Sequence, residues 1–246
     1  MISKISFSGA GWKLSFHLGV AKFLNEFDLV DRANLQVSGS SAGSMAALSF
    51  LLNKNMEALH QRLLDAADLV KYKFGIFGGN WSEVAVKILI EFNELDKKPK
   101  IHEMLADRLF VNVSQFPFTK KLYSRFKSNE HLIDVMLASA FIPAIAQKMT
   151  RPGAGWIYYD GSVTDNFPDL GEDTLRVGFA MGPFATQPHI KLSLSSGLMK
   201  VVRPDKALMQ KLFDDGYRQS VLYFLSDKPR LSWMQRSQPD PVVALG

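Results

Sequence analysis

The sequence contains no cysteine and only five histidines. Without cysteine there is no disulfide bond, no cysteine nucleophile and no metal site built from thiolates, and the composition is compatible with a reducing compartment. No stretch has the residue spacing of a zinc finger. We therefore expect neither a metal nor another cofactor.

Long apolar runs are also missing from the sequence. No run reaches the roughly 18 residues that a membrane-spanning helix requires, and the longest candidate, residues 84–92, is interrupted by Lys87 and Glu91. Residues 1–7 lack the apolar core of about 7–15 residues that is typical of a secretory signal peptide. These absences lead us to expect a cytoplasmic protein that is soluble or attached peripherally to a membrane.

The formal net charge is +5 and the sequence pI is about 9.3. Basic residues occur in scattered pairs, such as Lys97 with Lys98 and Lys120 with Lys121, rather than in one block. Such pairs are typical of solvated faces, and no aromatic RNA-binding signature accompanies them. We therefore expect no nucleic-acid partner, whereas mild basicity suits an anionic lipid surface.

The length of 246 residues and the apolar fraction of 47% are enough for one α/β domain with a full core. No repeat, heptad run or low-complexity segment divides the chain. After residue 226 the sequence becomes proline-rich and polar. We expect one domain over residues 1–226 and a loose tail over residues 227–246.

Two strand–turn–helix units open the chain. Residues 2–7 alternate apolar side chains with serine or lysine, as a strand does, and residues 14–24 carry apolar side chains at helical spacing. Residues 35–37 resemble a second short strand, and residues 42–52 resemble the helix that follows it. This order indicates an α/β protein with a mostly parallel sheet and flanking helices.

Similar patterns continue along the rest of the chain. We expect helices at residues 56–69, 130–140 and 206–225, and strands at residues 109–113, 120–126, 157–159, 175–179 and 190–194. Residues 73–81 are apolar but irregular and contain three glycines. Two interpretations stay open for that segment, a buried loop and a mobile cover over a functional site.

Ser41 is the central residue of a Gly-x-Ser-x-Gly motif that runs from Gly39 to Gly43. The motif ends a short apolar run and opens a helix, as in a nucleophile elbow, where glycines permit a turn tight enough to expose the serine hydroxyl. Motifs of five residues also occur by chance. The hypothesis of a catalytic serine therefore depends on a base and on oxyanion donors elsewhere in the chain.

A serine hydroxyl is a weak nucleophile, so a base must take its proton during attack. One solution is a histidine that follows the acid in chain order, and His189 is the only histidine after Asp160. The other solution is Asp160 itself, because an apolar pocket raises the pKa of a carboxyl toward that of a useful base. Asp160 with Gly161 is also a common turn dipeptide, so a purely structural role stays open.

Gly9, Ala10 and Gly11 lie between an expected strand and an expected helix. Their backbone N–H groups, next to the positive end of a helix, are suited to hold an oxyanion. The rival interpretation is the Gly-x-Gly-x-x-Gly fingerprint of dinucleotide sites. Leu14 occupies its third glycine position, and the second strand ends in the serine turn rather than in an acidic ribose ligand. We therefore favour acyl transfer over nucleotide binding.

Three motifs in this order resemble the patatin-like phospholipases, most closely the branch of adipose triglyceride lipase and adiponutrin. They are residues 8–13, residues 39–43 and the pair of Asp160 with Gly161, and residues 17–21, 137–143 and 158–168 support the resemblance. The resemblance implies a three-layer α/β/α fold with a mostly parallel central sheet. It also implies hydrolysis of acylglycerol or phospholipid esters at a membrane or lipid-droplet surface.

The resemblance further implies roles for individual residues. It implies a catalytic dyad of Ser41 and Asp160 without histidine, and an oxyanion site at the backbone N–H groups of residues 9–11. Lys13 matches a basic residue of many members, and Asn166 and Pro168 match the loop that follows the aspartate. Residues 1–226 would then form the acyl hydrolase domain.

Two positions depart from the family pattern. Leu14 replaces the last glycine of the loop, and Ser162 stands where glycine or alanine is usual after Asp-Gly. The change at Leu14 motivates one alternative, a lipid-binding or scaffold protein with little catalysis, and transfer of the acyl group to a lipid alcohol is another. Apolar side chains that could seat an acyl chain or contact a membrane are those of Phe74, Phe77, Trp81 and Ile88.

Overall fold

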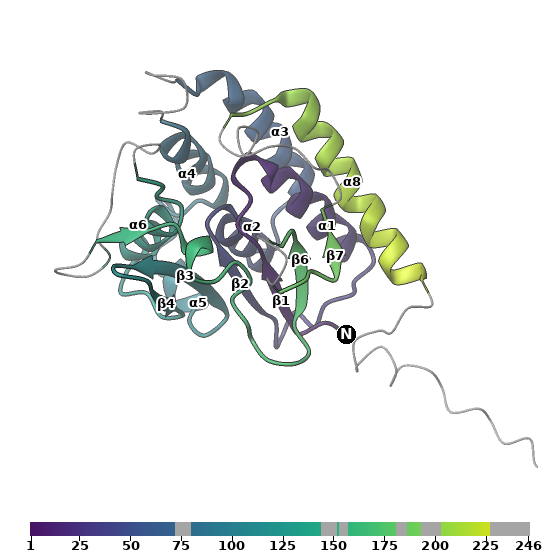
Figure 1. The fold of residues 1–246 in the computed structure, drawn as a ribbon, viewed down its shortest axis with the longest axis horizontal. Helices are drawn as coiled ribbons and strands as arrows, with labels where there is room; N and C mark the ends of the chain where they lie inside the picture. Colours follow the sequence, from purple (N-terminus) through teal and green to yellow (C-terminus); the bar gives the residue numbers. More distant parts are fainter. Residues whose placement is uncertain (72–79, 144–151, 153–156, 181–185, 193–202, 227–246) are drawn as a thin grey trace, which may run out of the picture.

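The structure, a computed structural model, describes residues 1–71, 80–143, 152, 157–180, 186–192 and 203–226 (Figure 1). Residues 81 and 82 are described by their backbone alone. The apolar segment that was interpreted as a buried loop or a cover, with the side chains of Phe74, Phe77 and Trp81, therefore lies outside the described residues. The same holds for the tail at residues 227–246.

One sheet organises the fold. Its strands are β1 (Lys4–Phe7), β2 (Gln36–Ser40), β3 (Leu109–Gln115), β4 (Thr119–Tyr123), β5 (Tyr158–Tyr159), β6 (Leu175–Gly178) and β7 (Ile190–Lys191). The seven strands have the order β4-β3-β2-β1-β6-β7, with β5 paired to β3 outside this path. Adjacent strands from β3 through β7 in this order pair in parallel, while β4 and β5 run antiparallel to β3.

Helices pack around this sheet. They are α1 (Leu14–Glu26), α2 (Ala42–Leu51), α3 (Met56–Ala66), α4 (Trp81–Asn93), α5 (Ile101–Met104), α6 (Asn129–Ser139) and α8 (Lys206–Leu225), with 3-10 turns η1 (Gly11–Lys13), η2 (Ala67–Leu69) and η3 (Gly161–Val163). The last described helix, α8, lies along the first, α1 (Figure 1). The rings of Phe23 and Tyr217 meet between them with centroids 5.5 Å apart.

The two faces of the sheet differ in polarity. On one face Phe7 of β1 packs against Phe50 of α2 and His17 of α1, with ring centroids 6.3 Å and 5.3 Å away. Because side chains alternate along a strand, Ser38 and Ser40 of β2 point to the opposite face, and both are fully buried. The polar face carries the segment that follows β5, as described below.

The sequence predicted the fold class correctly, an α/β fold with a mostly parallel sheet flanked by helices. It missed α4, whose apolar run seemed broken by Lys87 and Glu91. These two side chains form an i,i+4 ion pair on the exposed side of the helix, while Val86 and Leu89 are buried. The charges therefore mark the solvent face of an amphipathic helix. Of the helices in the described ranges, none is long and apolar enough to cross a membrane.

Candidate active site

Ser41 lies between the end of β2 and the start of α2, with φ of 53° and ψ of −129°. A non-glycine residue in this region of backbone space costs about 1–3 kcal/mol, so the surrounding structure must hold it there. The turn is tight enough that a Cβ on Gly43 would come within 2.4 Å of the carbonyl oxygens of Phe7 and Ser8. Gly39 meets the backbone of Gly43 in the same way. The geometry is that of a nucleophile elbow.

Asp160 lies next to Ser41, although the two are far apart in the sequence. It follows β5, is buried, and accepts a hydrogen bond from the Ser162 N–H at Oδ1, 2.9 Å away. Burial raises the pKa of the Asp160 carboxyl, and hydrogen bonds from Ser41 and Ser162 oppose this rise. A buried carboxylate with a raised pKa, beside a serine hydroxyl, is suited to accept the serine proton.

Polar side chains of two central strands hold the segment that carries Asp160. Ser38 of β2 donates to the carbonyl oxygen of Pro168 at 2.5 Å. In β3, Asn112 donates to the Gly161 carbonyl and Ser114 to the Asp160 carbonyl, each at 2.7 Å. Ser38, Asn112 and Ser114 were not among the predicted site residues. Their period-two spacing within apolar strands was the available signal, because an alternating polar residue on a buried strand needs a partner.

Ser139, near the end of α6, connects the serine turn to the neighbouring strand. Its hydroxyl accepts a hydrogen bond from the Ser41 N–H at 2.8 Å and donates to the Asn112 carbonyl at 2.6 Å. Gly161 lies against the same carbonyl, since a Cβ there would come within 2.1 Å of it. Ser139 lies in one of the stretches that carry the family resemblance, but no pattern in the sequence predicts this specific contact.

The glycine-rich loop contributes backbone donors beside the serine turn. The Gly9 N–H donates to Oδ1 of Asn166 at 3.0 Å, and Nδ2 of Asn166 donates to the Phe179 carbonyl at 2.8 Å. Gly9 is thus engaged by a side chain. Among the described residues, no acceptor bonds the N–H groups of Ala10 and Gly11, so these two are the amides of the loop that can face an oxyanion.

Lys13 and Leu14, at the start of the first helix, are both buried, whereas residues at a helix start are often exposed. Lys13 is buried, its Nζ lies 5.3 Å from the centroid of the Phe179 ring, and burial lowers its pKa. Leu14 is helical at the start of α1 and packs into the core. The leucine that replaces a family glycine is therefore accommodated by ordinary helical backbone and apolar packing.

His189 lies away from Ser41, and His17 bonds the backbone beside the glycine-rich loop. His189 precedes β7, which is separated from β2 by β1 and β6, about 14 Å at the usual spacing of strands. Its Nδ1 accepts the Arg176 N–H at 3.0 Å, and burial together with the charge of Arg176 lowers its pKa to about 4. Nε2 of His17 lies 2.9 Å from the Ser8 carbonyl, and burial lowers the pKa of His17 to about 4. Neutral His17 therefore donates to the glycine-rich loop.

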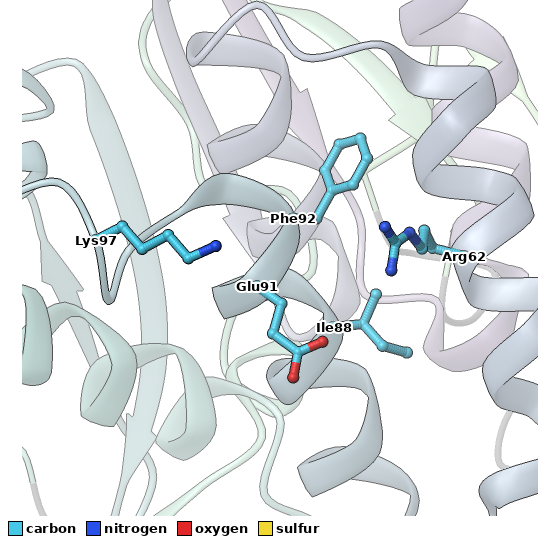
Figure 2. A pocket seen from close by; sticks show the side chains of 5 residues that line it. All are labelled: Arg62, Ile88, Glu91, Phe92 and Lys97. Atoms are coloured by element: carbon cyan, nitrogen blue, oxygen red, sulfur yellow. The ribbon is translucent and has the colours of Figure 1, made fainter.

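A surface cavity of about 270 Å³ opens between α3 and α4. Figure 2 shows Arg62 and Lys97 reaching toward it from opposite sides, with Ile88, Glu91 and Phe92 between them. Ile88 lines this cavity, but Ser41, Asp160 and residues 9–11 do not. The contact of Ile88 with an acyl chain therefore stays a prediction. In the described part of the chain, no three His, Asp or Glu side chains converge as metal ligands would.

Comparison with known proteins gives the same family as the motifs. The family model described as patatin-like phospholipase matches residues 5–169. In Homo sapiens, 1-acylglycerol-3-phosphate O-acyltransferase PNPLA3 is 24% identical over 192 residues, which are 76% of this chain and 39% of that protein. Patatin-like phospholipase domain-containing protein 2 is 25% identical over 266 residues, covering 98% of this chain and 51% of that protein.

Other relatives differ in length. Patatin-like phospholipase domain-containing protein 4 of Homo sapiens is 26% identical over 247 residues, covering 91% of this chain and 96% of that protein. The chain thus spans about half, or less, of the first two relatives and nearly all of the third. Among solved structures, VipD from Legionella pneumophila matches with a TM-score of 0.49 and 14% identity, over 88% of this chain and 65% of that chain.

Proposed function

The chain belongs to the patatin-like phospholipase family, and on this premise we propose that it is a serine lipid acyl hydrolase. It cleaves carboxylic ester bonds of acylglycerols or phospholipids, and the lipid is presented at a membrane or droplet surface. The observation that carries this proposal is the contact between Ser41, on its strained turn, and the buried carboxyl of Asp160. That pair supplies a nucleophile and a base without histidine.

The reaction proceeds through an acyl-enzyme on Ser41. As Oγ of Ser41 bonds the ester carbonyl carbon, its proton passes to the Asp160 carboxylate. Collapse of the tetrahedral intermediate breaks the ester C–O bond, and Asp160 returns the proton to the leaving alcohol. Water then attacks the acyl-enzyme, gives a proton to Asp160, and releases the fatty acid as Ser41 regains its proton. The raised pKa of Asp160 lies closer to the pKa of the Ser41 hydroxyl, which favours proton transfer between the two groups.

The tetrahedral intermediates carry a negative oxygen, and the N–H groups of Ala10 and Gly11 are the proposed donors to it. A backbone donor fixed by the fold needs no reorganisation when the charge appears, and one such donor is typically worth about 3–4 kcal/mol. Asn166 holds the loop through Gly9, while buried Lys13 ends the 3-10 turn that begins in the same loop. These residues position the donors rather than touch the reacting atoms.

A second candidate function is acyl transfer to a lipid alcohol instead of water. It is motivated by the name of one relative, a 1-acylglycerol-3-phosphate O-acyltransferase. The same dyad serves both reactions, because the alcohol and water deacylate Ser41 by the same route. Analysis of products with and without a lysophospholipid acceptor separates the two outcomes.

A substrate panel tests the proposed function. Triacylglycerol, monoacylglycerol, phosphatidylcholine and lysophosphatidylcholine are each incubated with the protein and with Ser41→Ala, and released fatty acid is measured. We expect release from at least one lipid and none from the variant. Equal release by the variant would overturn the proposal, and vesicle binding without release from any ester would favour the scaffold alternative.

A further inference from the structure

Four large apolar side chains are exposed around the end of the β3–β4 hairpin. The exposed fractions are 56% for Phe116, 78% for Phe118, 53% for Ile157 and 56% for Val163. We call these four residues the hairpin patch. Single exposed apolar side chains are ordinary, whereas a cluster of them marks a surface that binds another apolar surface.

Strand pairing makes the hairpin patch contiguous. The N–H of Phe116 donates to the Ile157 carbonyl at 2.9 Å, so β3 and β5 bring these residues side by side. The rings of Phe118 and Tyr159 lie edge to face with centroids 6.3 Å apart. Residues that are remote in sequence therefore form one surface.

The hairpin patch adjoins the candidate active site. Tyr159, in contact with Phe118, directly precedes Asp160. Val163 lies in η3, which begins one residue after Asp160. The residue after it is Thr164, whose hydroxyl lies 2.9 Å from the hydroxyl of Ser114. Ser114 pairs with Tyr159 across β3 and β5. A surface that docks here brings its molecules next to the dyad.

Two lysines adjoin the hairpin patch, and one of them pairs with a carboxylate among the described residues. Lys120 and Lys121 follow the hairpin end, and both are exposed. Lys120 pairs with Asp165 at 2.5 Å. Lys121 has no carboxylate within 4 Å among the described residues, and the chain carries a net charge of +5. Exposed aromatic rings beside lysines match the boundary between acyl chains and anionic headgroups.

We propose that the hairpin patch docks the protein on a phospholipid surface that contains anionic headgroups, with Phe116 and Phe118 inserted and Lys121 at the headgroups. This inference rests on the proposed function, because it explains how the dyad meets an insoluble ester. The patch differs from Phe74, Phe77, Trp81 and Ile88, since it lies in the turn between β3 and β4, just before β5 and in η3.

Vesicle binding tests the proposal. The full chain is measured by co-flotation with vesicles of phosphatidylcholine, with and without phosphatidylserine, in a Ser41→Ala background, so that the result is independent of whether Ser41 is a nucleophile. The double variant Phe116→Ser/Phe118→Ser is compared with Phe27→Ser. Phe27 is also 57% exposed, but it lies near Leu29, which bonds Ile2 before the amino end of β1, whereas Phe116 follows the carboxyl end of β3.

We expect the double variant to weaken binding by about tenfold or more, because each buried aromatic ring contributes substantially to transfer from water. Phe27→Ser should bind as the parent does. Lys121→Gln should weaken binding about fivefold on vesicles with phosphatidylserine and leave binding to pure phosphatidylcholine unchanged. Circular dichroism and thermal unfolding establish that each variant is folded.

Three results would overturn the proposal. The parent protein could fail to bind vesicles, the double variant could bind as the parent does, or Phe27→Ser could lower binding equally. Light scattering tests whether the hairpin patch binds a second copy of the chain instead of a vesicle. A parent dimer that becomes monomeric in the double variant, with vesicle binding unchanged, would also contradict the proposal. Absence of ester hydrolysis with hairpin-dependent binding would instead contradict the proposed function alone.

Discussion

Asn166 accepts the backbone N–H of Gly9 at 3.0 Å and thereby joins the segment after Asp160 to the glycine-rich loop. Its Nδ2 reaches the Phe179 carbonyl, at the end of β6, at 2.8 Å. One side chain therefore links the segment of Asp160, the proposed base, to the loop of the proposed oxyanion donors. A fixed separation matters, because electrostatic stabilisation depends on donors that are in place before charge develops.

Replacing Asn166 with alanine should lower kcat about 100-fold with little change in KM, because a small displacement of catalytic groups has effects of this size. The loop would lose its connection to the Asp160 segment while the substrate pocket stays intact. Steady-state kinetics on a water-soluble ester measures this. Asn34→Ala is the matched control, since Asn34 bonds Asp31 at an exposed position, and an equal loss there would contradict the assignment.

The pH dependence of activity should follow the Asp160 carboxyl. Burial raises its pKa above the ordinary value of 3.8, and only the ionised form accepts the Ser41 proton. The ratio kcat/KM should therefore rise with pH through the raised pKa, with an acidic limb above about pH 4. A profile that is flat from about pH 4 upward would contradict the role of Asp160 as base.

The same shift predicts a stability effect of opposite sign. Because the folded pKa is raised, the neutral carboxyl contributes stability that is complete below the unfolded pKa and is lost as pH rises through the folded pKa. Asp160→Asn keeps an acceptor for the Ser162 N–H and avoids the buried charge. It should raise Tm at pH 7 by an amount that shrinks toward about pH 4. A lower Tm of Asp160→Asn at pH 7 would show that burial is not the dominant influence on the pKa of Asp160.

Ser139→Ala should reduce both stability and activity. The substitution leaves the Ser41 N–H without its acceptor at 2.8 Å, and an unsatisfied buried group costs about 1–3 kcal/mol of unfolding free energy. The strained serine turn would relax, so kcat should fall. Urea unfolding and ester kinetics measure the two effects. Ser220→Ala is the control, because buried Ser220 only bonds the Gly216 carbonyl within α8; if it lost as much activity, the specific role of Ser139 would be excluded.

His189→Ala should retain most activity. Two strands separate His189 from the strand that ends at Ser41, and its ring bonds the Arg176 backbone. Kinetics with a parallel unfolding measurement checks this. A loss of several hundredfold in a folded variant would restore a catalytic triad.

The sequence predicted the parts of this molecule that are encoded locally. The first two strand–turn–helix units, β1 with α1 and β2 with α2, follow from periodicity and from glycines at fixed positions. The glycine-rich loop and Ser41 follow the carboxyl ends of β1 and β2, so the parallel sheet was sufficient to bring them to one end of the strands. Asp160 required the family resemblance, because its strand β5 has only two residues.

Other parts depend on pairings between distant segments. The contact of Ser114 with the Asp160 carbonyl arises from the register of β3 with β5, and no local pattern specifies that register. The same pairing assembles the hairpin patch from Phe116 and Ile157. Residues 84–92 were weighed only as a membrane-spanning run, which Lys87 and Glu91 interrupt, so the amphipathic helix α4 was not predicted.

The most direct test of the dyad is the reaction of a fluorophosphonate with the protein, with the modified residue identified by mass spectrometry of peptides. We predict one adduct, on Ser41, and labelling at least about 100-fold slower in Asp160→Asn, because general-base assistance contributes about this much or more. An adduct on another residue, or labelling of Asp160→Asn at the parent rate, would contradict the proposal that Asp160 activates Ser41.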